Sequence, residues 1–145
     1  MSERKFTTAN YLDAIDREIK KRETAYPKMI LKSDKNGLPD AETQELIDAL
    51  GIQLSRLEFA GQIIMEPDRG YLNKEVSTEI LAELTREYKM RKKCYPRWVA
   101  LRRMDATTAE CELAVWKEMC FWFADKFLGL DHLPPLSKRG HPIYP

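Results

Sequence analysis

A basic run between residues 86 and 103 is the part of the sequence with the clearest chemical character. It holds eight cationic side chains against one acid, Glu87. Such a density of charge can bind the phosphates of a nucleic acid or an acidic protein surface. Six of the cations fall outside the apolar stripe expected for this helix and form a candidate partner-binding surface, called the basic face below: Lys89, Lys92, Lys93, Arg97, Arg102 and Arg103.

Three aromatic residues are interleaved with these cations. Tyr88, Tyr95 and Trp98 could stack on unpaired bases if they were exposed. Their spacing continues the apolar stripe begun by Leu81 and Leu84, which predicts that they face the core instead. The basic face could simply be solvated, or it could dock on an acidic protein surface. An acidic protein surface is therefore the first candidate partner, and nucleic acid is the alternative.

Two further arginines, Arg22 and Arg91, lie on apolar stripes of their helices. They could form a pair of anion sites between two helical hairpins, as in a nucleotide-binding protein or an enzyme. They could equally form structural ion pairs, because Glu18 and Glu87 lie four residues upstream, the favourable orientation on a helix. We favour the structural interpretation, since charged groups on a core face usually occur in pairs.

The sequence lacks the usual signatures of catalysis or metal binding. Cys94, Cys111 and Cys120 form no C-x-x-C pair, so neither zinc nor another metal is predicted. His132 and His141 lie in a proline-rich tail and carry little weight. Without a glycine-rich phosphate loop or a nucleophile elbow, we expect no cofactor and no enzyme activity.

A motif repeats along the chain. Arg-Glu-x-Lys-x-Arg-x-x-x-Tyr-Pro occupies residues 17–27 and recurs 69 positions later at 86–96. A second match, Ala-Glu-x-Gln/Glu-x-x-Ile/Val, links 41–47 to 109–115 at a spacing of 68. Each proline should bend its helix, and each tyrosine should fill the bend with its hydroxyl reaching water. The residues assigned a structural role in the motif are Arg22, Tyr26, Pro27, Arg91, Tyr95 and Pro96.

The periodicity predicts four helices and no strand. Thr7 or Thr8 should cap the first helix, Asn73 or Ser77 the third, and a Thr107-x-x-Glu110 capping box the fourth. The resulting fold class is all-α, with two antiparallel hairpins at about 8–64 and 74–128 packed as a four-helix bundle. Residues 1–129 form one helical domain that ends near Gly129, and the proline-rich tail 130–145 should be extended.

The fourth helix is heavily apolar and aromatic over more than one face. Such a helix lies in the centre of a bundle or forms an oligomer interface. The composition therefore leads us to expect a homo-oligomer.

Composition indicates a soluble protein. Apolar residues make up 43% of the chain, charged residues 32%, and the net charge is +1. No apolar run approaches the roughly 18 residues of a membrane helix, so no membrane partner is expected. An odd number of irregularly spaced cysteines and no visible signal peptide predict a reducing, cytoplasmic compartment.

The repeated motif resembles small bacteriophage-encoded helical-hairpin proteins of unassigned function, in which it usually occurs once. The resemblance covers both hairpins but not the tail. It implies no catalytic residue. It implies an accessory protein in the host cytoplasm that binds and modulates or inhibits a host protein, such as a defence or DNA-processing factor.

Overall fold

The computed structural model describes residues 4–33, 41–68 and 73–132. These residues form four α-helices: α1 (Thr8–Ser33), α2 (Ala41–Met65), α3 (Lys74–Ala100) and α4 (Ala106–Phe127). A short 3-10 helix, η1 (Leu130–His132), follows. The predicted all-α fold with two hairpins is confirmed, and the hairpin boundaries agree with the prediction to within one residue.

The predicted caps of the first and third helices are confirmed. The side-chain oxygen of Thr7 accepts a hydrogen bond of 3.1 Å from the N–H of Asn10. The side chain of Asn73 accepts one of 2.8 Å from the N–H of Val76. Each cap satisfies an amide of the first turn that has no partner within its helix.

The predicted capping box of the fourth helix is wrong. α4 already begins at Ala106, and Asp105 is the cap, with its carboxylate accepting from the N–H of Thr108 at 3.2 Å. Thr107 and Glu110 therefore lie inside the helix. Asp105 suits the position because an acid is favourable next to the positive end of a helix as well as being a good cap.

The turn between α3 and α4 places an arginine in an unusual backbone conformation. Arg102 has a φ of 58°, in the left-handed region where glycine is normally found. Its N–H donates to the carbonyl of Val99 at 3.0 Å, and the N–H of Arg103 donates to that of Trp98 at 2.8 Å. These two bonds form a Schellman motif, which ends the helix sharply.

Gly129 ends α4 as predicted, with a φ of 101° and an N–H that donates to the carbonyl of Ala124. The tail is not extended from residue 130, because Leu130–His132 form η1 and Leu130 packs against the core. The apolar side chain of Leu130 draws this turn onto the core. Residues 133–145 lie outside the described part of the chain.

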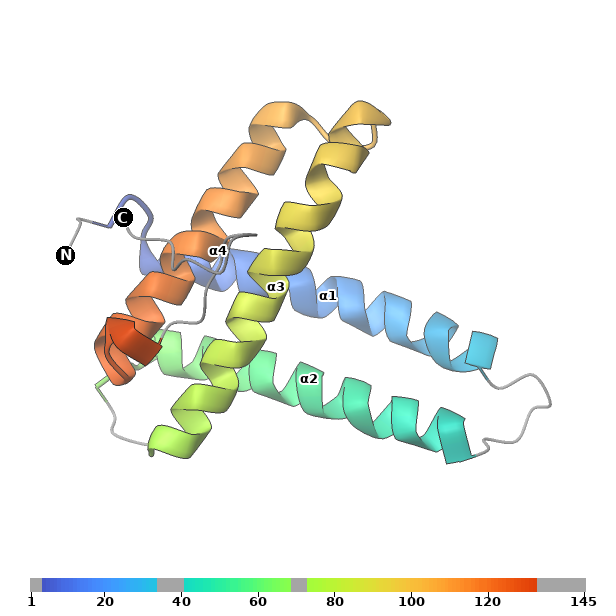
Figure 1. Ribbon diagram of the computed structural model, residues 1–145, viewed down its shortest axis with the longest axis horizontal. Coiled ribbons are helices and arrows are strands. Elements are labelled where there is room, and N and C mark those ends of the chain that lie inside the picture. Colours follow the sequence, from blue (N-terminus) through green and yellow to red (C-terminus); the bar gives the residue numbers. More distant parts are fainter. Residues whose placement is uncertain (1–3, 34–40, 69–72, 133–145) are drawn as a thin grey trace.

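The two hairpins cross, so that the α3–α4 turn and the far ends of α1 and α2 project in different directions (Figure 1). Within the hairpins, α1 packs on α2 and α3 on α4. Between them, α2 packs on α3 and α4 packs on α1, a reciprocal arrangement expected of a duplicated unit. The core lies at the crossing, and its largest fully buried side chains include Tyr11, Leu57, Leu84, Trp116 and Phe123.

α4 packs against α3 and α1 and buries most of its aromatic side chains in these contacts. Trp116, Phe121 and Phe123 are buried within one chain, and Trp122 and Phe127 are half-buried against the core. The apolar surface that suggested an oligomer is thus largely covered by the chain itself. Among the described residues, no helix is long and apolar enough to cross a membrane.

The repeat is matched in three dimensions by α1 and α3. The buried residues of α1 are Tyr11, Ala14, Ile15, Glu18 and Arg22, and each residue 69 positions later in α3 is also buried. The second helices differ from the expected spacing. Among described side chains, no buried residue of α2 has a buried counterpart 68 positions later. At a spacing of 66, three of the six buried residues of α2 have buried counterparts, Thr43 with Ala109, Leu50 with Trp116, and Leu57 with Phe123.

Candidate functional site

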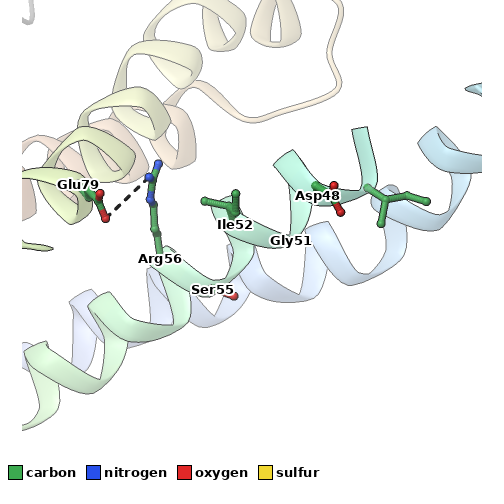
Figure 2. A pocket seen from close by; sticks show the side chains of 7 residues that line it. Asp48, Gly51, Ile52, Ser55, Arg56 and Glu79 are labelled. Carbon is green, nitrogen blue, oxygen red and sulfur yellow. Dashed lines mark ion pairs between the residues drawn. The ribbon is translucent and has the colours of Figure 1, made fainter. Parts of the chain in front are cut away.

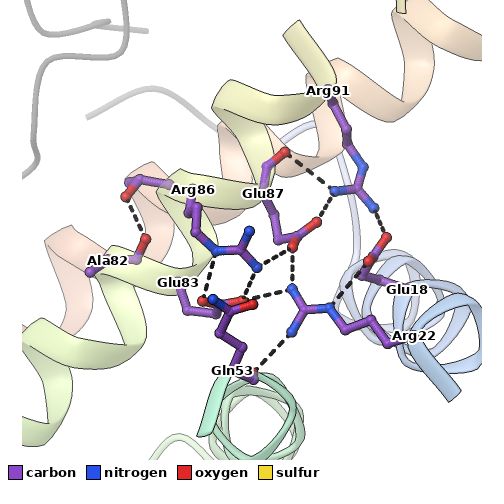
Figure 3. Close-up of polar contacts among 9 residues, drawn as sticks. Glu18, Arg22, Gln53, Ala82, Glu83, Arg86, Glu87 and Arg91 are labelled. Atoms are coloured by element: carbon purple, nitrogen blue, oxygen red, sulfur yellow. Dashed lines mark hydrogen bonds and ion pairs between the residues drawn. The ribbon is translucent and has the colours of Figure 1, made fainter. Parts of the chain in front are cut away.

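A buried cluster of charges lies between the hairpins, and its centre is formed by the repeated motif (Figure 3). Within each helix, an arginine pairs with the glutamate four residues upstream, Arg22 with Glu18 at 3.2 Å and Arg91 with Glu87 at 2.5 Å. The pairs also cross, because Arg91 contacts Glu18 at 2.5 Å and Arg22 contacts Glu87. The four side chains therefore form a pseudo-symmetric ring that joins α1 to α3.

Two α3 residues complete what we call the ion cluster. Glu83 is 3% exposed and contacts Arg22 at 2.6 Å and Arg86 at 2.7 Å. Arg86 also reaches Glu87 at 2.9 Å, and the backbone carbonyl of Gln53 accepts from Arg22 at 2.9 Å. The sequence analysis missed Glu83. Glu83 lies one helical turn before Glu87, among apolar residues of the same stripe, and this position in the sequence could have indicated that it is buried with Glu87.

The ion cluster is balanced in charge, with three glutamates against three arginines. Burial by itself lowers the pKa of Arg22, but the carboxylates of Glu87 and Glu83 outweigh it and raise that pKa. The guanidinium of Arg91 also lies over the ring of Trp116, 4.2 Å from its centroid. These contacts include the ion pairs expected of both arginines, whose charges are met by carboxylates of the chain itself.

The two Tyr-Pro pairs lie inside helices that continue beyond them. Pro27 and Pro96 are both exposed residues within α1 and α3. Tyr26 is half-buried, whereas Tyr95 is 2% exposed and its hydroxyl is buried. The predicted access of the Tyr95 hydroxyl to water is therefore wrong, because the ring packs beside Trp98, with centroids 5.5 Å apart. The expected bends at the prolines stay predictions.

The basic face follows one side of the outer half of α3 and continues into the turn. Lys89, Lys93 and Arg97 succeed each other at intervals of one helical turn and are exposed, and Lys92 beside them is half-buried. Arg102 and Arg103 are exposed in the turn itself. Within the described part of the chain, five of the six cations form no ion pair: Lys89, Lys93, Arg97, Arg102 and Arg103.

Apolar side chains flank this basic face. Met90 is 40% exposed and Leu101 is 52% exposed, and helical spacing places both in the row adjoining Lys93 and Arg97. Tyr88 and Tyr95 are buried as predicted, and Trp98 is half-buried. The surface thus combines unpaired cations with exposed aliphatic groups, while two of the three rings that might stack on bases are in the core.

A seventh cation, Lys117 of α4, extends the positive region, and the sequence analysis missed it. Burial lowers its pKa, and the neighbouring charges of Lys92 and Lys5 lower it further. Lysines from α3, α4 and the segment before α1 therefore lie close enough to repel one another. Only the packing of the hairpins brings these distant positions together.

No family model, curated protein or solved structure matches this chain. The functional argument therefore rests on the surfaces of the molecule. Among described residues, no group of three or more His, Cys, Asp or Glu side chains could hold a metal ion. Cys94, Cys111 and Cys120 carry free thiols, and burial raises the pKa of the Cys120 thiol.

Proposed function

We propose that this chain is a non-enzymatic binding protein that docks on an acidic surface of a protein partner through its basic face. The observation that carries the proposal is the row of exposed cations along α3 that form no ion pair with a described residue, Lys89, Lys93 and Arg97. Arg22 and Arg91, in contrast, are neutralised internally by the carboxylates of the ion cluster. Unneutralised charges on one face steer association toward a surface of opposite sign.

The neighbouring apolar side chains favour a protein over a nucleic acid. Exposed Met90 and Leu101 adjoin the cations, and methionine and arginine are both enriched in the cores of protein interfaces. Nucleic-acid interfaces are more polar, and binding of single strands depends on exposed rings. Tyr88 and Tyr95 are buried and unavailable for this purpose. Nucleic acid, bound through its phosphates, stays the alternative partner.

The strained turn supports the same conclusion. A left-handed arginine costs roughly 1–2 kcal/mol relative to an ordinary conformation, and glycine would avoid this cost. Arg102 nevertheless occupies the position, at the end of the row of cations. Strain of this kind is frequently found at functional sites. We interpret Arg102 as a residue retained for its charge.

The resemblance to bacteriophage hairpin proteins gives the proposal its setting. In that setting the partner is a host protein in the cytoplasm, such as a defence or DNA-processing factor, whose acidic surface would be occluded. The third possibility, a nucleotide or enzyme site between the hairpins, is less favoured because Glu18, Glu83 and Glu87 already occupy Arg22 and Arg91. A self-association interface is not required by this proposal, and homo-oligomerisation stays a prediction.

A charge-reversal experiment tests the proposed function. The variant Lys89→Glu/Lys93→Glu/Arg97→Glu reverses three exposed cations of α3, and Lys20→Glu/Lys21→Glu/Lys28→Glu reverses three exposed cations of α1. Both change the net charge equally. We expect the wild type and the α1 variant to capture the same protein from bacterial lysate, with or without nuclease, and the α3 variant to lose it.

Nucleic acid would be indicated by a different result. Capture would then disappear after nuclease treatment. The purified protein would also bind generic duplex DNA, and the logarithm of its binding constant would fall linearly with the logarithm of the salt concentration. Equal capture by the two charge-reversal variants would refute the assignment of the basic face.

A further inference from the structure

Three lysines from three different elements lie together on the second hairpin. Lys5 precedes α1, Lys92 belongs to α3 and Lys117 belongs to α4. They are close enough for the charges of Lys92 and Lys5 to lower the pKa of Lys117, in addition to the larger effect of burial. We call these three residues the lysine triad.

The packing of α3 on α4 fixes two members of the triad. The guanidinium of Arg91 lies 4.2 Å from the ring centroid of Trp116, and Lys92 and Lys117 are the next residues of the two helices. Both lysines are half-buried. Because their stems lie partly against the protein, the two ammonium groups have limited freedom to move apart.

The N-terminal segment, residues 4–7, brings the third lysine onto α4. The N–H groups of Lys5 and Phe6 donate to the carboxylate of Glu118 at 2.9 and 3.0 Å. Phe6 also packs against the core. Since Glu118 follows Lys117 in the chain, these contacts hold Lys5 beside Lys117.

The shared fold does not require this concentration of charge. At the position equivalent to Lys92, 69 residues earlier, α1 has Glu23. Neither Lys5 nor Lys117 forms an ion pair with a described residue. Like charges held together repel one another, and an anion bound between them removes this repulsion. The lysine triad therefore indicates a site for an anion.

The first hairpin has a shallow hollow on α2, but there the charged groups are met by the chain itself (Figure 2). Arg56 pairs with Glu79 at 3.8 Å. Asp48 accepts a hydrogen bond from the side chain of Gln44 at 3.0 Å. The contrast makes the lysine triad the stronger candidate for a charged ligand.

We propose that the lysine triad binds a phosphate monoester, carried as a phosphorylated side chain by the protein partner that docks on the basic face. Such a group has about 1.5–2 negative charges at pH 7 and three acceptor oxygens, so it can accept from three ammonium groups. A carboxylate or a nucleic-acid phosphodiester carries a single charge and neutralises the triad less well. The inference rests on the proposed function, because Lys92 belongs to the basic face and the phosphate would belong to the same partner.

A short peptide with phosphoserine between capped glycines tests the site, because its phosphate is its only charged group. It is titrated into the isotope-labelled full chain, and NMR follows the side-chain signals of the lysines. We expect saturable shifts at Lys5, Lys92 and Lys117. Binding should also raise the pKa of Lys117 toward its ordinary value of 10.5, because the phosphate stabilises the charged ammonium.

The variant Lys117→Gln should weaken binding of the phosphopeptide at least about tenfold, the loss expected for one charge-assisted hydrogen bond. The control Lys21→Gln removes the same charge from an exposed position of α1 and should leave the affinity unchanged. Thermal unfolding of each variant checks that it is folded.

Glu118→Ala separates assembly of the site from simple charge. Loss of this carboxylate would by itself favour an anion nearby. It also releases the N-terminal segment, and with it Lys5. We therefore expect weaker binding of the phosphopeptide, and tighter binding would contradict the role of the segment in the site.

The proposal is overturned if the phosphopeptide causes no saturable shift at millimolar concentration, if it shifts all exposed lysines alike, or if the unphosphorylated peptide binds equally well. Tighter binding of inorganic phosphate than of the phosphopeptide would also overturn it, because the site would then suit a free anion. If the α3 charge-reversal variant loses partner capture but the wild type does not bind the phosphopeptide, this inference fails and the proposed function stands. Phosphopeptide binding together with unchanged capture by that variant would refute the proposed function and leave the phosphate site.

Discussion

The two hairpins share the interface that joins them and differ on the surfaces that face outward. All five buried residues of α1 have buried counterparts in α3, and the arginines and glutamates of the ion cluster pair reciprocally. The outer surfaces have diverged. Lys20 of α1 is paired with Asp16 at 3.0 Å, whereas its counterpart Lys89 forms no ion pair with a described residue.

The divergence continues along the same face. Where α1 has Lys21, α3 has Met90, and where α1 has Glu23, α3 has Lys92. The α1 face is thus mixed in charge. Exposed apolar groups occur on both helices, since Met29 and Leu31 of α1 are exposed too, so uniform positive charge is what distinguishes the α3 face. A duplicated unit that keeps its pairing interface can change its outer faces independently, because surface substitutions rarely alter stability strongly. The comparison therefore assigns stability to the shared residues and binding to the residues that differ.

The largest expected effect concerns the ion cluster and probes how far its symmetry extends. Glu87→Gln removes the carboxylate that contacts Arg22, Arg86 and Arg91, and should destabilise the fold by about 3–5 kcal/mol because buried cations lose their partner. Glu18→Gln changes the equivalent residue of α1, which contacts two arginines rather than three. Its cost should be smaller. Urea denaturation of both variants measures the difference, and equal losses would contradict the asymmetry.

A second prediction concerns Tyr11, whose counterpart in α3 is Ile80 and has no hydroxyl. Tyr11 donates to Glu118 at 2.7 Å, so Tyr11→Phe should cost about 1.5–3 kcal/mol, the usual value of a hydrogen bond to a charged group. Burial and then Glu118 raise the pKa of Tyr11 above its ordinary value of 10.0. The unfolded chain therefore loses this proton first as the pH rises.

The sign of the pH effect follows from that shift. The contribution of Tyr11 to stability is complete below pH 10 and declines as the pH rises through its folded pKa. The free energies of unfolding of wild type and Tyr11→Phe are measured by denaturation at neutral pH and above pH 10. The difference between them should be smaller above pH 10. Tyr88→Phe is the comparison for burial alone: its pKa is raised mainly by burial, without a glutamate, so its difference should narrow in alkali too but should lack the loss of a hydrogen bond to Glu118 at neutral pH. If wild type and Tyr11→Phe differed in free energy of unfolding by the same amount at all pH values, the Tyr11 hydroxyl would not have the stabilising role assigned to it.

Much of the fold could be predicted from the sequence because helical periodicity and caps are local. Thr7, Asn73 and Gly129 place three helix ends without reference to the rest of the chain. The ion cluster was only half predictable. The pairs of Arg22 with Glu18 and Arg91 with Glu87 lie within single helices, whereas their crossed contacts join residues far apart in sequence. These contacts depend on how the hairpins cross.

The register of the second helices was not predictable for a related reason. The match between 41–47 and 109–115 is real in the sequence, but three of the six buried residues of α2 have buried counterparts at a spacing of 66, and among described side chains none has one at 68. Two positions on a helix rotate a side chain by about 200°, so this small difference changes which face is buried. Packing against the preceding helix selected the face. The fourth cap was missed because Asp105 lies two residues before a motif that also has capping chemistry.

The turn of the α3–α4 hairpin provides a prediction in which stability and binding change in opposite directions. Arg102→Gly should stabilise the protein by about 1 kcal/mol, because glycine adopts the left-handed conformation without strain. The same change removes a cation and should weaken partner binding. Arg103→Gly is the control, because it also removes one positive charge, from the adjacent residue, and should not increase the free energy of unfolding. If Arg102→Gly is not stabilising, strain does not explain the position.

The smallest effect is expected at Gly51, where the comparison of the second helices is sharpest. Its counterpart at the spacing of 66 is Lys117, on the α4 surface that the N-terminal segment covers. Gly51→Ala should raise the free energy of unfolding by about 0.5–1 kcal/mol, because alanine favours the helix and its Cβ meets nothing. Urea denaturation measures the change, and a variant without added stability would mean that the helix is strained at this position for another reason.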